Sequence, residues 1–220
     1  LLDVHKDVQI IGEASNTMEA IELIESKKPD LLFLDIQMPQ WNGFDLLEKL
    51  NFTPQVIFTT AYDQYAVKAF EVNALDYLLK PINPERLNST LENCQKDFAK
   101  NTANQEQTSS DFSKQIFIKD GEQCHFIRLR DIRYLKAYDN YVRLYFNNTS
   151  AMIKKSLNAL EERLHPELFF RCNRAEVINL QMIKEVQALP KGKLRILLQS
   201  GEIVDVSERK SAVFRERMGL

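Results

Sequence analysis

Three polar side chains follow three successive apolar runs of the chain, each where a run ends. Asp35 follows LLFL, Thr60 ends QVIFTT, and Lys80 follows DYLL and precedes Pro81. A carboxylate can attack phosphorus and form an aspartyl phosphate, an ammonium neutralises phosphate charge, and a hydroxyl can hydrogen-bond a phosphoryl oxygen. Taken singly, each residue has a simpler explanation as a cap, a solvated charge or an ordinary strand residue. Together they predict a site for phosphoryl transfer onto Asp35, provided that the three runs are neighbouring strands.

The first half of the chain alternates apolar runs with amphipathic stretches, a pattern typical of βα units around a parallel sheet. The predicted strands are Val8 to Glu13, Leu31 to Asp35, Gln55 to Thr60 and Asp76 to Leu79. The predicted helices are Met18 to Ser26 with Asn16 or Thr17 as its cap, Gly43 to Leu50, Gln64 to Val72, and Pro84 to about Lys100. Solid apolar strands indicate a doubly wound α/β sheet with helices on both faces, and sites in such sheets form beyond the carboxyl ends of the strands.

The second half has a different pattern. Residues 101–113, NTANQEQTSSDFS, are almost entirely polar and predict a linker between a domain at 1–100 and a domain at 114–220. From Gln115 onward, short alternating apolar runs are separated by the turn pairs DG, NN, KG and SG. This pattern predicts a mostly antiparallel β domain, with one helix at Leu157 to Leu164 and a short one after Ser207.

The charge of the chain is divided between these halves. The 220 residues carry a net charge of −2, which is the sum of −9 over residues 1–112 and +7 over residues 113–220. A basic half favours a polyanionic partner such as nucleic acid. The three cysteines form no CxxC pair, which argues against disulfides and structural zinc. No apolar run approaches the roughly 18 residues of a membrane span, so we expect a cytoplasmic protein.

The stretches DIQMPQWNGFDLL and IFTTAYDQYAVKAFEVNALDYLLKP, with their spacing, resemble the receiver domain of bacterial two-component response regulators. The resemblance covers about residues 1–100 and implies a flavodoxin-like fold. It implies that a histidine kinase phosphorylates Asp35, that Thr60 is the switch hydroxyl, that the rotamer of Tyr77 follows the switch, and that Lys80 pairs with the phosphate. It also implies a cis bond between Lys80 and Pro81, and Mg²⁺ held by Asp35 and the backbone carbonyl of Gln37.

The chain departs from this family in one respect. Receivers begin with a strand that ends in an acidic pair for Mg²⁺, whereas the residues before Val8 contain no such pair and LLDVHKD is similar to the end of the family's first helix. Asp3 and Asp7 precede the second strand of the family's fold, so we expect them far from the site. The sequence as given therefore predicts a receiver without its first strand and with an incomplete Mg²⁺ site, either because an N-terminal segment of the parent protein lies outside it or because the protein is truncated.

The stretches YLKAYDNYVRLYF, SLNALEERL, FFRCNRAEVINLQMI and VSERKSAVF resemble the LytTR type of DNA-binding domain, over about residues 114–220. That family places loops of small β-sheets into successive major grooves. The resemblance implies base contacts from Arg174, a second contacting loop with Asn140 and Tyr141, and a third with Arg209 and Lys210. Arg143 is expected in the same surface, and Lys154, Lys155 and Arg171 are expected at phosphates. Asn173 and Ala175 flank Arg174 where many relatives carry His and Ser.

Three functions are compatible with these patterns. The first is a phosphorylation-switched transcription regulator that binds double-stranded DNA as a homodimer, through the receiver surface around Gln64 to Leu79 and the last receiver helix. The second is a constitutive DNA-binding protein whose receiver is only a dimerisation scaffold. The third is a module that binds an acidic protein. An enzyme acting on a small molecule is not expected, because the only chemistry found is phosphoryl transfer onto Asp35 and its hydrolysis.

Overall fold

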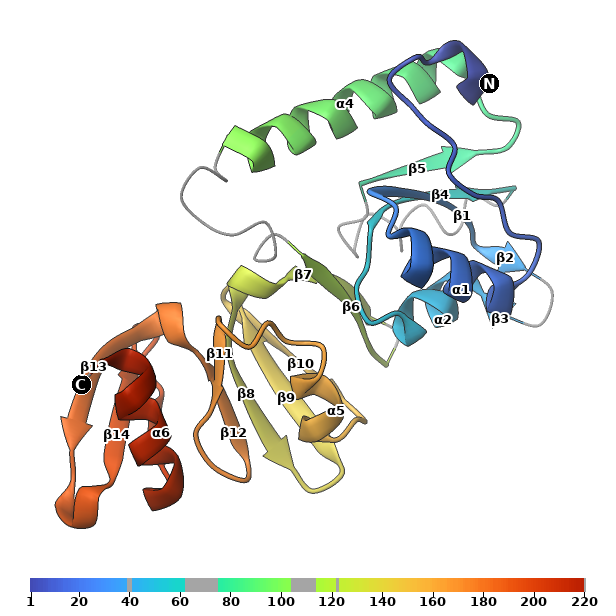
Figure 1. The fold of residues 1–220 in the computed structure, drawn as a ribbon. Coiled ribbons are helices and arrows are strands. Elements are labelled where there is room, and N and C mark those ends of the chain that lie inside the picture. Colours follow the sequence, from blue (N-terminus) through green and yellow to red (C-terminus); the bar gives the residue numbers. More distant parts are fainter. Residues whose placement is uncertain (39–40, 62–74, 104–113, 122, 220) are drawn as a thin grey trace. The chain divides into compact units, whose positions relative to one another are not determined.

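The computed structural model describes residues 1–38, 41–61, 75–103, 114–121 and 123–219. Among these residues the contacts define two compact units, named here the N-terminal unit (1–103 with 114–126) and the C-terminal unit (127–219). Figure 1 shows the elements of both units. No helix in the described ranges has the length and apolar character needed to cross a membrane.

The N-terminal unit is built on a parallel sheet with the strand order β1-β4-β5. Its strands coincide with three of the predicted apolar runs: β1 (Leu31–Asp35), β4 (Gln55–Thr60) and β5 (Asp76–Leu79). In register, Asp35 lies beside Thr59, and Thr60 lies beside Leu79. The three strands therefore end together, which confirms that Asp35, Thr60 and Lys80 share one edge of the sheet.

Asparagine side chains start the first two α-helices of this unit. The side-chain oxygens of Asn16 and Asn42 accept hydrogen bonds from the backbone N–H groups of Glu19 and Asp45, at 3.0 and 2.9 Å. These bonds satisfy donors that the first turn of a helix leaves free. Asn16 is thus the cap of the first α-helix rather than Thr17. The short elements and helices are η1 (Leu2–Val4), α1 (Thr17–Lys27), β2 (Gln37–Met38), β3 (Trp41–Asn42), α2 (Gly43–Lys49) and α4 (Pro84–Ala103).

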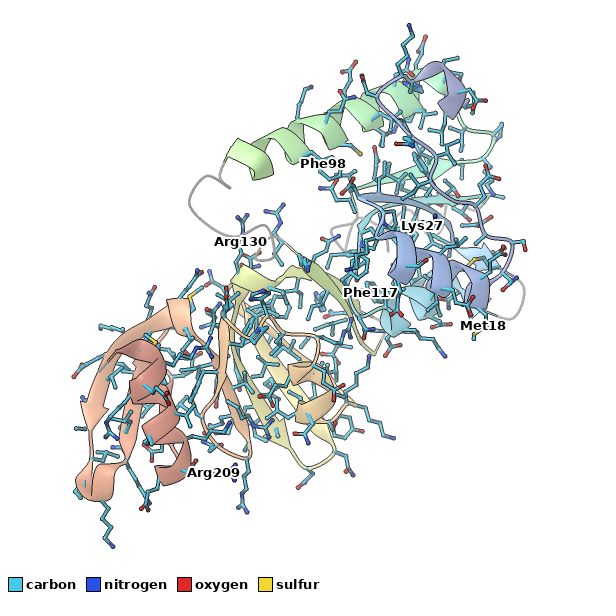
Figure 2. The ribbon with its side chains drawn as sticks, viewed as in Figure 1. Met18, Lys27, Phe98, Phe117, Arg130 and Arg209 are labelled. Carbon is cyan, nitrogen blue, oxygen red and sulfur yellow. The ribbon has the colours of Figure 1, made fainter. Side chains whose placement is uncertain are left out.

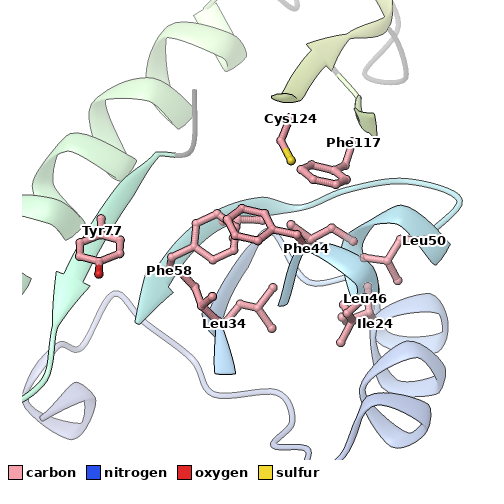
Figure 3. Close-up of a cluster of buried hydrophobic side chains, with 12 residues drawn as sticks. Ile24, Leu34, Phe44, Leu46, Leu50, Phe58, Tyr77, Phe117 and Cys124 are labelled. Atoms are coloured by element: carbon pink, nitrogen blue, oxygen red, sulfur yellow. The ribbon is translucent and has the colours of Figure 1, made fainter. Parts of the chain in front are cut away.

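Both faces of the sheet are covered, as its apolar strands predict. Leu34 and Phe58 face α1 and α2, in a buried cluster that Figure 3 shows. Ile57 and Leu78 face the opposite side and pack against Leu87 and other residues of α4. Successive strand residues point to opposite faces, so a run without polar residues supplies two cores at once.

The predicted strand at Val8 to Glu13 is wrong, because the structure shows no strand there. Its backbone has no neighbouring strand to pair with, and β1 pairs only with β4 among the described strands. A cavity of about 820 Å³ lies between the two segments and is lined by residues 8–16 on one side and 29–35 on the other. An apolar alternation becomes a strand only when backbone groups on another strand accept and donate its hydrogen bonds. Ile10 and Ile11 are consequently exposed.

Two other predictions concern residues at the edge of the described ranges. The helix predicted at Gln64 to Val72 lies outside the described residues. The last receiver helix begins at Pro84 as predicted and continues past Lys100 to Ala103, into the start of the predicted linker. The remainder of that linker, residues 104–113, also lies outside the described part.

A β-hairpin of β6 (Gln115–Asp120) and β7 (Gln123–Arg128) packs against the N-terminal unit up to residue 126. Phe117 is fully buried in the cluster of Figure 3, where its ring centroid lies 6.3 Å from that of Phe44. Lys119 Nζ also pairs with Asp45 Oδ1 at 3.0 Å. The chain thus stops packing with the N-terminal unit after residue 126. The boundary predicted from the linker falls earlier, at residue 113. The predicted domain boundaries stay a prediction.

The C-terminal unit is antiparallel, as its sequence predicts. A five-stranded sheet has the order β10-β9-β8-β12-β11 and a three-stranded sheet the order β13-β14-β15. The strands of the first sheet are β8 (Ile132–Tyr138), β9 (Tyr141–Phe146), β10 (Thr149–Ile153), β11 (Phe169–Arg171) and β12 (Glu176–Asn179). The remaining elements are η4 (Leu129–Asp131), α5 (Leu157–Glu161), η5 (Leu180–Met182), β13 (Ile183–Ala188), η6 (Pro190–Gly192), β14 (Leu194–Leu198), β15 (Ile203–Val206) and α6 (Glu208–Met218).

The predicted turns and helices of this unit are present with altered lengths. Asn147, Lys191 and Gly201 have φ values of 45°, 60° and 96°, the left-handed conformation that tight turns between strands require. The helix predicted to end at Leu164 ends at Glu161, and the short helix after Ser207 continues to Met218. One buried cluster joins the two sheets and α6, in which the rings of Phe170 and Phe214 meet edge to face at 5.1 Å.

Candidate functional site

The predicted phosphoryl-transfer site is centred on an ion pair between Asp35 and Lys80. Lys80 Nζ lies 2.7 Å from Asp35 Oδ2, although 45 residues separate the two in sequence. The second carboxylate oxygen, Oδ1, accepts a hydrogen bond from the backbone N–H of Gln37 at 3.0 Å. The Asp35 side chain is 34% exposed. A carboxylate oriented by a cation and a backbone N–H, and open to solvent, can react with a phosphoryl donor.

The two predicted switch residues lie close to this pair in the sheet. Thr60 is completely buried at the end of β4, and its carbonyl oxygen accepts a hydrogen bond from the backbone N–H of Lys80 at 2.8 Å. Tyr77 is also buried, and it lies beside Phe58 in register. The bond between Lys80 and Pro81 is cis, as the resemblance implies. The switching roles of Thr60 and Tyr77 stay predictions.

The described residues do not fit a Mg²⁺ site. Mg²⁺ is held in an octahedron of oxygen atoms, usually by one or two carboxylates, water and substrate phosphates. In the ranges that the structure describes, no group of three or more His, Cys, Asp or Glu residues is placed to hold a metal ion. Asp35 is the carboxylate at this edge, and Lys80 already neutralises it. Gln37, the other predicted ligand, lies exposed in β2.

Gly43 supports the site in a way that the sequence did not reveal. Its backbone N–H donates to the carbonyl oxygen of Ile36 at 2.8 Å, which places the start of α2 against the end of β1. A Cβ atom on Gly43 would lie 2.8 Å from the backbone oxygen of Asp35 and 3.1 Å from Leu34 Cγ. The sequence signal was a glycine at the first position of a helix, eight residues after a strand-terminal aspartate.

Replacing Gly43 with alanine is expected to destabilise the N-terminal unit by about 1–3 kcal/mol, because the closest atom belongs to the backbone and cannot rotate away. Urea unfolding followed by the fluorescence of Trp41, the only tryptophan, measures this loss. Gly12→Ala is the matched control, since its Cβ would meet only the Leu23 side chain at an ordinary 3.7 Å. Equal unfolding free energies for the two variants would contradict the close packing at Gly43.

Most of the residues predicted to contact DNA gather at one end of the five-stranded sheet of the C-terminal unit. Tyr138 faces Tyr141 across the β8–β9 turn, and Ile153 at the end of β10 faces Val142 at the start of β9. Because β12 is antiparallel to β8, it begins beside the end of β8. The turn, the end of β10 and the loop between β11 and β12 therefore lie together. These segments carry Asn140, Tyr141, Arg143, Lys154, Lys155, Arg171 and Arg174.

The β8–β9 turn presents aromatic and cationic side chains to solvent. Tyr138 and Tyr141 are 42% and 45% exposed, and Asn140 lies between them in the exposed turn. The Arg143 guanidinium carbon lies 5.5 Å from the Tyr138 ring centroid. This cation–π contact orients the cation along the strand. Lys154 and Lys155 follow β10 beside the same turn, with Lys154 exposed and Lys155 half-buried.

Residues 172–175, which we call the arginine loop, present Arg174 as an exposed side chain. Arg171, immediately before the loop, points into the protein. Its Nε donates to the carbonyl of Asn173 and one Nη donates to the carbonyl of Arg174, both at 2.6 Å, while the other Nη lies 2.8 Å from Glu161. The Arg171 side chain is 14% exposed. Its predicted phosphate contact stays a prediction, and the structure shows it holding the loop backbone.

The third predicted segment begins beside the arginine loop. The backbone N–H of Ser207 donates to the carbonyl of Cys172 at 3.0 Å, and α6 starts at the next residue. Arg209 and Lys210 lie in the first turn of α6. Figure 2 shows Arg209 at the same end of the unit as the β8–β9 turn. The structure thus brings all three predicted basic segments together.

Glu176 is a half-buried carboxylate within this basic surface. Burial by itself would raise the pKa of Glu176, but hydrogen bonds from Tyr134, Asn173 and Lys136 outweigh burial and hold the pKa below its usual value. Burial and the bond to Glu176 raise the pKa of Tyr134, so this phenol remains a donor. Lys136 Nζ lies 3.1 Å from Glu176 Oε1 and compensates its charge.

Acid is therefore expected to destabilise the C-terminal unit through Glu176. Since the folded pKa of this carboxyl lies below the unfolded value of about 4.3, the stabilisation is complete above that value and is lost as the pH falls through the folded pKa. Below about pH 4.3, the free energy of unfolding of the wild type should fall more steeply than that of Glu176→Gln, which cannot titrate. Urea unfolding at several pH values measures both slopes, and parallel slopes would contradict a shifted Glu176.

All three cysteines carry buried thiols. Burial, the largest cause, raises the pKa of the Cys172 thiol, which disfavours the reactive thiolate. Cys94 lies on α4 and packs with Ile57 and Leu78 of the sheet, and Cys124 packs in the cluster of Phe117. The thiols behave as small apolar side chains in these positions.

Comparisons with known proteins agree with both halves of the chain. The family model of the response regulator receiver domain matches residues 1–92, and that of the LytTr DNA-binding domain matches residues 122–219. Receiver domains typically bind Mg²⁺ at their phosphorylation site.

Three similar proteins span nearly the whole chain. Sensory transduction protein LytT of Enterococcus faecalis is 33% identical over 100% of this chain and 92% of its own length. LytT of Bacillus subtilis is 35% identical over 94% of this chain and 87% of its own length, and transcriptional regulatory protein BtsR of Escherichia coli is 31% identical over 100% and 92%. Proteins with these domains are regulators, a non-enzymatic kind. The chain therefore belongs to the response regulators in which a receiver domain is followed by a LytTR DNA-binding domain.

Proposed function

We propose that this protein is a phosphorylation-regulated transcription factor of a bacterial two-component system, and that a sensor histidine kinase phosphorylates Asp35. The observation that carries the proposal is the 2.7 Å pair of Asp35 and Lys80 at the open edge of the sheet. In the reaction, a carboxylate oxygen of Asp35 bonds to the phosphorus atom, and the bond from phosphorus to the kinase histidine nitrogen breaks with its electron pair on nitrogen. The Lys80 ammonium offsets the charge that the phosphoryl group adds.

Phosphorylation is proposed to act through β4 and β5. Thr60 lies one residue beyond Thr59, the neighbour of Asp35 in register, and a phosphoryl group on Asp35 offers acceptor oxygens to its hydroxyl. Movement of Thr60 leaves space for Tyr77, and the receiver surface around Gln64 to Leu79 then dimerises. Residues 64–74 of that surface lie outside the described part of the chain.

The C-terminal unit is proposed to bind double-stranded DNA with its gathered basic segments. Arg174 is suited to bidentate hydrogen bonds with guanine O6 and N7 in the major groove. Arg209, Lys210, Asn140, Tyr141 and Arg143 complete the base-facing surface, and Lys154 and Lys155 contact phosphates. Two such surfaces in a homodimer gain affinity through effective concentration. We place the protein in the cytoplasm, where DNA and the kinase domain are accessible.

The proposal predicts DNA binding that responds to a phosphoryl donor. Duplexes selected by the protein from a random library serve as probes, with and without acetyl phosphate and Mg²⁺. Tighter binding with the donor is expected for the wild type and not for Asp35→Ala, and intact mass spectrometry should detect one added phosphoryl group only in the wild type. Asp45→Ala is a control, because it removes a receiver carboxylate that pairs with Lys119 rather than with Lys80.

The alternative function is constitutive DNA binding with the receiver as a dimerisation scaffold. It is favoured by the finding that the described residues do not fit Mg²⁺. Equal affinity in every condition, together with an unmodified Asp35, would support this alternative and overturn the phosphorylation switch.

A further inference from the structure

Asn173 lies in the arginine loop next to Arg174, and its side chain is turned toward the protein. One N–H of its amide donates to Glu176 Oε2 at 2.7 Å, and the other donates to the backbone carbonyl of Asp205 at 2.9 Å. Its oxygen Oδ1 accepts from the backbone N–H of Ala175 at 2.8 Å. An amide group has two N–H donors, and both are used here. Asn173 therefore has no donor left for a base or a phosphate.

Each partner of Asn173 belongs to a different part of the unit. Ala175 is in the same loop, and its carbonyl accepts from the backbone N–H of Ala137 at the end of β8. Glu176 starts β12 and also binds Tyr134 of β8. Asp205 lies near the end of β15, in the second sheet. One side chain thus links the arginine loop to both sheets.

The link to Asp205 fixes where α6 begins. Asp205 is followed after one residue by Ser207, whose N–H donates to the carbonyl of Cys172 at the start of the arginine loop. These two hydrogen bonds form a short clamp between the arginine loop and the chain that enters α6. Arg209 lies two residues beyond Ser207. The clamp therefore holds the backbone of Arg174 at a fixed spacing from the backbone of Arg209.

The surrounding contacts also restrain the backbone that carries the exposed Arg174 side chain. The Arg171 guanidinium donates hydrogen bonds to the carbonyls of Asn173 and Arg174. These bonds restrain the backbone on both sides of the Arg174 side chain. Glu176, a carboxylate in a basic surface, is neutralised by Lys136 and receives the Asn173 amide. Binding sites function best when the residues that touch the ligand are held by neighbours that do not touch it.

We propose that Asn173 is a positioning residue for DNA recognition, which sets the spacing between Arg174 and the basic first turn of α6 without touching DNA. The inference rests on the proposed DNA-binding function. Without the clamp, the loop and the helix start have to be ordered when DNA binds, and that ordering lowers affinity.

The test uses the full chain, a duplex selected by the wild type from a random library, and a duplex of unrelated sequence. Asn173→Ala is expected to weaken binding to the selected duplex roughly threefold to tenfold, the scale of one or two hydrogen bonds. The salt dependence of binding should be unchanged, because no phosphate contact is removed. Gln199→Ala is the matched control, since it also removes a side-chain amide that donates to a backbone carbonyl, that of Gln181. Gln199 follows the end of β14, whereas Asp205 pairs with Arg195 near the start of that strand.

A double-mutant cycle separates positioning from direct contact. In an Arg174→Ala background, Asn173→Ala is expected to change affinity by less than about twofold, because its effect passes through Arg174. The same loss in both backgrounds would show that Asn173 acts on DNA directly and would overturn the proposal. An unchanged affinity for Asn173→Ala in the wild-type background would also overturn it.

A second variant and a measurement without DNA keep the test decisive if alanine disturbs folding. In Asn173→Ser, the hydroxyl can still accept from the N–H of Ala175, but it is too short to reach Asp205. Hydrogen exchange should become faster at the Ser207 amide in both variants, and faster at the Ala175 amide only in Asn173→Ala. Unchanged exchange at Ser207 would contradict the clamp. A wild type that selects no DNA sequence would instead overturn the proposed function itself.

Discussion

Replacing Arg174 with alanine is expected to weaken binding to the selected duplex roughly tenfold to a hundredfold, the scale of one bidentate contact to guanine. Binding to unrelated DNA should weaken much less, so the variant loses discrimination between sequences. The reason is geometric: the Arg174 side chain is exposed, and the Arg171 guanidinium holds its backbone carbonyl in place. Fluorescence anisotropy with both duplexes measures the two affinities.

Two control variants distinguish base reading from charge. Lys154→Ala is expected to weaken binding to both duplexes alike and to reduce the salt dependence by about one phosphate contact. Arg130→Ala removes the same charge as Arg174→Ala at the opposite end of the C-terminal unit, as the labels of Arg130 and Arg209 in Figure 2 show. If Arg130→Ala lowered affinity for the selected duplex as much as Arg174→Ala does, the basic end of the sheet would not be the recognition surface.

Replacing Phe117 with alanine is expected to lower the free energy of unfolding of the N-terminal unit by about 3–5 kcal/mol. Phe117 is fully buried, and its ring lies 5.2 Å from that of Phe126 and 6.3 Å from that of Phe44. Removing the ring leaves a cavity between β6, β7 and α2 that the surrounding side chains cannot fill. Urea unfolding followed by Trp41, which lies in β3, measures the loss.

The position of Phe117 makes this variant a test of where the β6–β7 hairpin belongs. Phe98→Ala is the control, because Phe98 lies on α4, is only half-buried, and its removal should cost less. Residues 114–126 pack with the N-terminal unit, although the linker suggested a boundary before them. A loss confined to the C-terminal unit, detected by hydrogen exchange of β8 and β9, would show that the hairpin folds with that unit instead.

The sequence predicted the elements whose formation depends on nearby residues. The strands that end at Asp35, Thr60 and Leu79 follow from solid apolar runs, and the cap at Asn16 follows from local side-chain chemistry. The antiparallel half follows from alternating residues and turn pairs with left-handed φ. These patterns are local, so a reader of the sequence can recognise them without knowing what they pack against.

The residues of the candidate sites could be named from the resemblance, but their neighbours could not. Gly43 is close to the backbone of Asp35 because α2 folds back onto β1, and no residue spacing reveals that approach. Arg171 was expected at phosphate, whereas its guanidinium holds the arginine loop. Asn173 links two sheets through Asp205, a contact across 32 residues of chain.

Tertiary structure also decided whether two segments pair with a neighbouring strand and which unit they pack against. Val8 to Glu13 has the composition of a strand, but no strand of the described residues pairs with it, so it forms no strand and lies next to a cavity of about 820 Å³. The β6–β7 hairpin has the alternation of the antiparallel half, yet it packs on Phe44 and Phe58 of the N-terminal unit. Apart from Val8 to Glu13, the sequence by itself determined where the described strands, helices and turns form, because propensity and periodicity act over a few residues. Only the tertiary structure decided which elements pair and which side chains meet, because hydrogen bonds and packing join residues that are distant in the chain.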